Sequence, residues 1–176
     1  MQSFSLELYP LSGQIHIALY TNVKNSADLK KRLLSHDQEL KYAFIDAKVV
    51  LDKFQLLVAV NNAVHYEMYS KLKTHNVHSE IVYNLSPTTN ISESLRRFGI
   101  SDSTSEIIVV KVGGNNVEVK SHLNTLIDGE ESSLDVFSRF ADRSCIKKYY
   151  KISNNINDHE EILNIIIGSL AIKNVN

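Results

Sequence analysis

The sequence predicts a single mixed α/β domain, residues 1–176, in which a sheet containing antiparallel strands is packed by helices. Short segments near the N-terminus alternate apolar and polar residues, which is typical of half-buried strands. Two longer segments, 52–72 and 157–172, instead carry apolar residues at helical spacing. The chain is long enough to bury a sizeable core, and it contains no repeat, low-complexity run or linker that would divide it.

The first two strands are predicted to form an antiparallel hairpin. Residues 4–8 alternate and end at Tyr9-Pro10. After a turn at Ser12-Gly13, residues 14–23 alternate again, and one face of this strand carries Ile15, Ile17 and Leu19. A strand with one apolar face is expected to cover the core with that face.

Two helices are predicted next, each from the residue that caps it. Asn25 is expected to cap the first helix, with Asp28 in its first turn and with an apolar side made of Leu29, Leu33 and Leu34. Asp52, followed three residues later by Gln55, resembles a capping box. It should open a longer helix that ends near Leu72, with an apolar side formed by Phe54, Leu57, Val58, Val64 and Met68.

The middle of the chain predicts a strand, a turn and a short helix. Residues 79–84 are expected to form the strand, and Pro87 marks the turn. Asn90 and Glu93 have the spacing of a capping box, and Gly99 stands where a helix often ends in a left-handed residue. The start of this helix offers free backbone N–H groups and a positive dipole end, which can hold a phosphate or a carboxylate.

Residues 106–112 are the strongest predicted strand and are apolar on both faces, as central strands are. Gly113-Gly114-Asn115-Asn116 has the composition of a hairpin turn that leads into residues 117–119. Residues 134–141 are expected to be a short helical segment, and residues 147–152 a late strand.

The last predicted helix is apolar on more than one side. Asn157 and Glu160 are expected to form its capping box. One side of the helix carries Ile162, Ile165, Ile166 and Ile172, and another carries Leu163, Ile167 and Leu170. A surface helix needs one apolar stripe for its own core. We therefore expect the second stripe to contact a partner.

The composition is ordinary for a soluble globular protein. The formal net charge of −1 gives no global field that would attract nucleic acid. The single Cys145 is compatible with a reducing compartment and is best explained as a small apolar residue. No signal peptide and no membrane-spanning segment are expected, so we expect a protein of the nucleus and cytoplasm.

No motif in the chain predicts catalysis. The sequence lacks a Gly-x-Ser-x-Gly elbow, a P-loop and a kinase signature, and Asp46 and Asp52 are better explained as helix caps than as an acid–base pair. His65, His75 and His78 do not have zinc-site spacing. We expect no catalytic site, metal or cofactor, and no nucleotide hydrolysis by the chain alone. Two alternatives stay open: a small phosphate-ester-binding enzyme that uses the helix start at Asn90, and a homodimeric scaffold that hides the C-terminal helix.

The most distinctive segment runs from residue 71 to residue 100. It contains Lys71-Leu72-Lys73-Thr74-His75, Ser79-Glu80-Ile81, Asn84-Leu85-Ser86-Pro87 and Asn90-Ile91-Ser92-Glu93-Ser94-Leu95-Arg96-Arg97-Phe98-Gly99-Ile100. This segment resembles the PRPK-binding subunit of the KEOPS (EKC) complex, a family of small proteins that bind an atypical kinase-ATPase and help to modify tRNA. Weaker matches extend the resemblance over nearly the whole chain, at Val23-Lys24-Asn25, from Asp46 to Gln55, and from Ile146 to Ser153. The resemblance favours a loop and a helix across 121–127 in place of the hairpin after Gly113.

The resemblance implies a non-catalytic subunit that binds and modulates the kinase-ATPase. It also implies a contribution to recruiting tRNA for threonylcarbamoyl-adenosine formation next to the anticodon, with the other KEOPS subunits contacted indirectly. The predicted kinase-binding residues lie on the C-terminal helix and are Ile162, Ile165, Ile166, Ser169 and Ile172.

The predicted RNA site is local and small. Two or three cations and one helix start can hold a few phosphates, which suits a single-stranded end better than a duplex. The resemblance implies that this end is the unpaired acceptor end of tRNA. The predicted tRNA-binding residues are Lys71, Lys73, His75, Asn90, Ile91 and Arg97. His75 stands where some relatives have arginine, and a neutral imidazole holds phosphate more weakly than a permanent cation.

Overall fold

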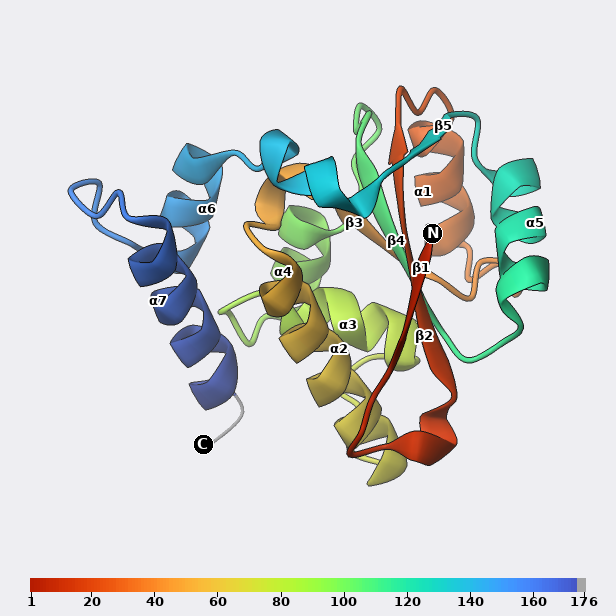
Figure 1. Ribbon diagram of the computed structural model, residues 1–176, viewed down its shortest axis with the longest axis horizontal. Coiled ribbons are helices and arrows are strands. Elements are labelled where there is room, and N and C mark those ends of the chain that lie inside the picture. The colour runs from red at the N-terminus through yellow and green to blue at the C-terminus, as the bar shows by residue number, and fades with distance from the viewer. Residues whose placement is uncertain (174–176) are drawn as a thin grey trace.

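Figure 1 shows the computed structural model of the protein, which describes residues 1–173. Its strands are β1 (Gln2–Ser5), β2 (Gln14–Thr21), β3 (Ala43–Asp46), β4 (Ile107–Val112) and β5 (Glu130–Ser132). Its α-helices are α1 (Ser26–Leu34), α2 (Lys53–Met68), α3 (Val77–Asn84), α4 (Ile91–Phe98), α5 (Asn116–Leu126), α6 (Arg143–Tyr150) and α7 (His159–Ile172). Short 3-10 helices are η1 (Pro10–Ser12), η2 (Ala47–Val49) and η3 (Leu134–Phe140). The predicted mixed α/β class is confirmed.

The sheet is antiparallel, with the strand order β1-β2-β4-β3. The predicted hairpin is confirmed, since Gln2 pairs with Ile17 and Ser5 pairs with Gln14. β5 pairs with the second half of β2, so β1 and β5 follow one another along the edge of β2 that β4 does not occupy. β4 lies between β2 and β3, as its continuous apolar sequence predicted.

Helices cover both faces of the sheet, and each face has its own core. One core joins Ile15, Ile17 and Leu19 of β2 to α2, α3 and α7. The other joins Ala18 and Tyr20 of the same strand to α1 and α5. Figure 1 shows α1 and α5 on one side of the strands and the remaining helices on the other. This two-sided burial explains why β4 has no polar face.

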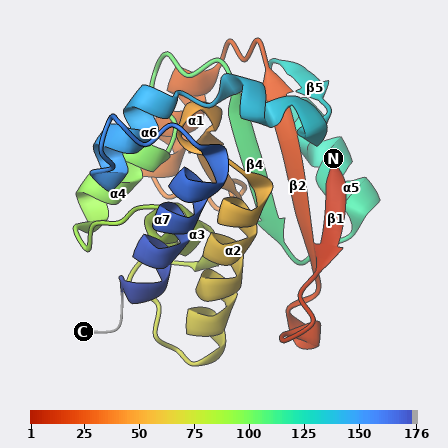
Figure 2. The same ribbon diagram turned by 60° about the vertical axis from the view of Figure 1, so that its left-hand side comes forward.

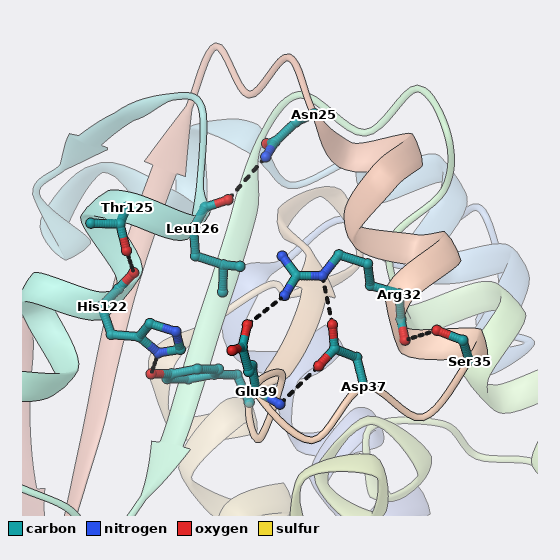
Figure 3. Close-up of polar contacts among 9 residues, drawn as sticks. Asn25, Arg32, Ser35, Asp37, Glu39, His122, Thr125 and Leu126 are labelled. Atoms are coloured by element: carbon teal, nitrogen blue, oxygen red, sulfur yellow. Dashed lines mark hydrogen bonds and ion pairs between the residues drawn. The ribbon is translucent and has the colours of Figure 1, made fainter.

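Polar contacts tie the smaller helical layer together (Figure 3). The Asn25 side chain donates to the Leu126 carbonyl at 2.9 Å and accepts from the Asp128 N–H at 3.1 Å. It therefore links the start of α1 to the end of α5 and does not cap α1 through its side chain, contrary to the prediction. The His122 ring on α5 is hydrogen-bonded to the Tyr42 hydroxyl at 2.6 Å.

The predicted strand over 79–84 is wrong, because these residues form α3. Asn76 caps this helix by accepting from the N–H groups of His78 and Ser79, and the Ser79 hydroxyl accepts from the Asn76 N–H in return. The helix is buried on most of its surface, so its sequence shows a short apolar run without helical periodicity. Such a run cannot be distinguished from a buried strand by pattern alone.

Two other predicted strands are also helical. Residues 147–152 largely belong to α6, which Asp142 caps through the Cys145 N–H and which ends in left-handed Lys151. The turn at Gly113-Gly114 is present, but Asn115 then caps α5, so residues 117–119 are helical. The helix implied by the family resemblance is confirmed, and the local hairpin is wrong.

Several helix ends differ from their predicted form. α7 is capped by Asp158 and not by Asn157, whose side chain instead accepts from Lys147 Nζ at 2.9 Å. α2 ends at Met68, short of Leu72, and Ser70 then takes a left-handed conformation. Gly99 is extended and not left-handed, but a Cβ atom there would lie 2.5 Å from the Leu95 carbonyl oxygen, so the close approach requires glycine.

The capping boxes are only partly formed. Asp52 caps α2 by accepting from the Phe54 N–H, while Gln55 Oε1 accepts from the Leu51 N–H at 2.8 Å rather than from Asp52. Asn90 caps α4 as predicted, but the Glu93 side chain pairs with Arg97.

Candidate functional site

Helix α7 buries one stripe against the body of the protein. It packs along α2, as Figure 2 shows, and places Ile162, Ile166 and Leu170 in the larger core. Ile162 and Ile166 were predicted to contact a partner, and the structure corrects this: Ile166 is 0 % exposed and Ile162 is nearly as buried. These two side chains hold α7 in place and are not available to another protein.

The other predicted residues of α7 form an outer edge, which we define as Ile165, Ser169 and Ile172. Ile165 and Ser169 are half-buried, and Ile172 is 69 % exposed. The three residues are spaced at i, i+4 and i+7, so they share one side of the helix. The Ser169 hydroxyl donates to the Ile165 carbonyl at 2.9 Å, so its polar group is satisfied within the helix. An apolar edge with satisfied polar groups suits burial against a partner.

The N-terminal end of α7 adds negative charge to this edge. Asp158, Glu160 and Glu161 line a shallow hollow that also reaches Asn164 and Ile165. Part of this charge serves the helix itself, since Asp158 caps it and acidic residues stabilise a helix N-terminus. A partner that covers the outer edge therefore meets apolar side chains next to an acidic end, which is complementary to apolar residues flanked by cations.

A second candidate site is the basic loop, defined here as residues 70–76 between α2 and α3. Lys71, Lys73 and His75 are all exposed in it. Glu80, which is 0 % exposed, anchors the loop from the protein interior. Its Oε2 atom accepts from the Lys73 N–H at 3.0 Å, the Thr74 N–H at 2.9 Å and the Thr74 hydroxyl at 2.8 Å. The backbone of the loop is therefore fixed while its cationic side chains reach solvent.

His75 has an aromatic neighbour from another part of the chain. Its ring centroid lies 4.8 Å from that of His36, edge to face. His36 follows α1 in a left-handed conformation. The contact joins the basic loop to the end of α1.

The remaining predicted RNA-binding residues lie beyond α3. Asn90 accepts from the Glu93 N–H at 3.0 Å as the cap of α4, and Ile91 is partly exposed beside it. Arg97 pairs with Glu93 and lies over the Tyr149 ring at 5.0 Å. The basic loop precedes α3 and Asn90 follows it, and α3 is about 12 Å long. Within residues 1–173, no hydrogen bond or ion pair joins the two groups, so the assumed convergence on one small site does not follow from the structure.

Helix α3 also connects the basic loop to α6 and α7. Lys173, just after α7, donates to the Tyr83 carbonyl, and Tyr150 of α6 donates to the Leu85 carbonyl. Both groups satisfy carbonyls at the end of α3, where the last carbonyls of a helix have no partner within the helix. Burial lowers the pKa of Lys173 to about 7. These roles were not predicted, because residues 79–84 were expected to form a strand; the Asn76-x-x-Ser79 pair is the sequence signal that indicates a helix there.

Comparison with known proteins assigns the chain to a family. A sequence model of the family described as "Kinase binding protein CGI-121" matches residues 20–174. The chain belongs to the CGI-121 family. This CGI-121 protein is 38 % identical to "EKC/KEOPS complex subunit cgi121" of Aspergillus fumigatus, over 98 % of this chain and 96 % of the relative. It is 37 % identical to the subunit CGI121 of Gibberella zeae, over 99 % of both chains, and 39 % identical to the subunit TPRKB of Danio rerio, over 89 % of both.

Membership of the CGI-121 family confirms the resemblance found in residues 71–100.

The histidines of this protein contact neighbouring residues of its own fold. His78 accepts from the Val112 N–H at 3.2 Å, and burial, together with Lys111 and Lys41, lowers its pKa to about 3. Within residues 1–173, no three His, Cys, Asp or Glu side chains gather as they would around a metal ion, and no helix is long and apolar enough to span a bilayer.

Proposed function

We propose that this protein is a non-catalytic subunit of an EKC/KEOPS complex, in the nucleus and cytoplasm, that binds and modulates the small atypical kinase-ATPase. The observation that supports this most directly is the outer edge of α7 in a member of a kinase-binding family. Ile172 is exposed although the same helix buries Ile162, Ile166 and Leu170. Burying a large aliphatic side chain contributes about 1.5–3 kcal/mol, so Ile165 and Ile172 together can supply much of a specific contact.

The first prediction tests this edge by charge. Ile172→Glu, alone and with Ile165→Glu, should weaken kinase binding at least about a hundredfold, because a carboxylate in an apolar contact loses its hydration without gaining a partner. Affinity is measured by titrating the kinase subunit and by co-purification. The matched control is Leu34→Glu on α1, since Leu34 is 73 % exposed but lies on the other face of the sheet, and this variant should bind as wild type.

The same variants also distinguish binding of the kinase from binding of a second copy of the chain. A homodimer would hide the same edge, so the purified chain should be sized with and without the kinase. Normal kinase binding by a folded Ile165→Glu/Ile172→Glu protein would refute the proposed contact. A stable dimer that both substitutions dissociate would favour the homodimeric alternative.

The same proposal includes helping to recruit tRNA for threonylcarbamoyl-adenosine formation next to the anticodon. Its support is the basic loop, where Lys71 and Lys73 are exposed on a backbone that Glu80 anchors. Two cations contact only a few phosphates, which is compatible with an unpaired acceptor end and too few for a duplex. Asn90 and Ile91 would extend this contact only if the single-stranded RNA runs from the basic loop along α3.

The second prediction concerns these two lysines. Lys71→Glu/Lys73→Glu should weaken tRNA binding and flatten its salt dependence, because each lost phosphate contact removes about 0.7 from the slope of log K against log salt on a single strand. Kinase binding should not change. The control is Lys24→Glu/Lys148→Glu, which makes the same change in charge at two exposed lysines before α1 and on α6. Trimming the unpaired end should weaken binding to the wild type and have little further effect on the Lys71→Glu/Lys73→Glu protein. If that protein still distinguishes trimmed from intact tRNA as well as the wild type does, the site lies elsewhere.

A further inference from the structure

Aromatic rings gather where α2 ends. The ring centroid of His65 lies 4.7 Å from that of Tyr69, 5.6 Å from Tyr66 and 5.9 Å from Tyr9. Tyr9 belongs to the connection between β1 and β2, and its hydroxyl is hydrogen-bonded to His65 Nδ1 at 2.7 Å. His65 is thus held from two elements, while Tyr69, packed on it, is 60 % exposed.

This exposed ring is next to the basic loop. Ser70 turns the chain through a left-handed conformation, and the Lys71 N–H then donates to the Tyr66 carbonyl at 2.7 Å. Tyr69 and Lys71 are two residues apart, so their Cα atoms are at most about 7 Å from each other. An aromatic face in fixed position beside exposed cations is the arrangement that single-stranded nucleic acid needs, with a stacked base and a held backbone.

The nearest acidic side chain on α2 does not oppose this arrangement. Glu67 is two residues before Tyr69, and the helical repeat places it on nearly the opposite side of α2. Exposed Met68 precedes Tyr69 in the sequence, exposed Leu8 precedes Tyr9, and both would also suit an apolar protein contact. Lys71, Lys73 and His75 make the RNA assignment the better one, because they complement phosphate.

We propose that Tyr69, supported by His65, stacks on one base of a single-stranded RNA end while Lys71 and Lys73 hold the neighbouring phosphates. This inference rests on the proposed RNA role and adds a base-binding element to it. The element recognises the face of a base and therefore tolerates different sequences, in contrast to hydrogen bonding to base edges.

A single fluorescent residue provides the direct test. The chain contains no tryptophan, so Tyr69→Trp introduces the sole indole. A four-nucleotide single-stranded RNA should quench its emission by stacking, whereas an abasic ribose-phosphate chain of the same length should not. The matched control is Phe54→Trp, because Phe54 is 55 % exposed at the other end of the same helix, about 22 Å away, and its indole should not be quenched.

Affinity gives a second readout. Tyr69→Ala should bind the four-nucleotide RNA about 5- to 100-fold more weakly, and Tyr69→Phe should bind it as the wild type does. Neither change should alter binding of the abasic chain or folding, since Tyr69 is largely exposed. The inference is overturned if Tyr69→Ala keeps wild-type affinity while Lys71→Glu/Lys73→Glu loses it, a result that leaves the proposed RNA role intact. If neither variant changes RNA affinity, both ideas fail. If Tyr69→Ala weakens only kinase binding, the aromatic face is a protein contact and not a base platform.

Discussion

The Ile166→Glu protein should fail to fold. Ile166 is completely buried between α7 and the larger core, where Ile162 and Leu170 are its neighbours on the helix. Removing a buried aliphatic side chain alone costs about 2–5 kcal/mol, and an unpaired buried carboxylate adds several more. Since small domains are stable by only about 5–15 kcal/mol, this one substitution removes most of the free energy of unfolding.

Urea unfolding followed by circular dichroism measures this effect. The control is Ile172→Glu, six residues further along the same helix, which should change the free energy of unfolding by no more than about 0.5 kcal/mol because its site is exposed. The pair separates two roles of one helix: the inner stripe stabilises the fold, and the outer edge binds. A cooperative, near-wild-type transition for Ile166→Glu would show that α7 does not dock on α2 through this stripe.

The Glu80→Ala protein should lose both stability and RNA affinity. The Glu80 carboxylate accepts three hydrogen bonds from Lys73 and Thr74, and hydrogen bonds to a charged group contribute about 1.5–3 kcal/mol each, without being additive. We expect a loss of about 3 kcal/mol of unfolding free energy. The amide protons of Lys73 and Thr74 should lose their protection from hydrogen exchange, because both donors then face solvent.

The direction of the change in RNA affinity distinguishes the role of the anchored loop from a simple effect of charge. Removing a carboxylate makes the protein more positive, which by charge alone would strengthen RNA binding. We predict the opposite, since the lysines of the basic loop then lack a fixed backbone and their ordering must be supplied on binding. The control is Glu118→Ala on α5, an exposed position with the same change in charge. Tighter RNA binding by Glu80→Ala than by Glu118→Ala would mean that the anchored loop does not matter.

Elements with a strong local pattern could be predicted from the sequence. The alternation in β2 and the continuous apolar run of β4 identified both strands, and helical spacing identified α2 and α7. Residues 79–84 and 147–152 could not be identified in this way. α3 is buried on most of its surface, so no polar face marks its period, and the apolar residues of α6 follow a cap, Asp142, that lies outside the predicted strand.

The candidate sites were also predictable only where the local sequence pattern is strong. The sequence alone assigned the family through residues 71–100 and showed that the C-terminal helix carries more apolar surface than one core needs. It also placed Lys71, Lys73 and His75 in one loop. The buried carboxylate that anchors this loop was not predictable. Glu80 was assigned to a strand, and the side chain of a strand residue would not be expected to point toward the loop.

Only the tertiary structure decided how α7 is rotated and how the predicted RNA residues are arranged. A helical wheel gives the angles between Ile162, Ile165 and Ile166, but the stripe that turns inward depends on the surface that α2 presents, which is set by residues a hundred positions earlier. Likewise, the convergence of the basic loop and Asn90 was assumed from two ends lying on the same edge of the sheet, whereas residues 79–84 are not a strand of the sheet and α3 lies between the two groups. Local pattern therefore determined what most elements are, and non-local packing determined which of their faces remain for a partner.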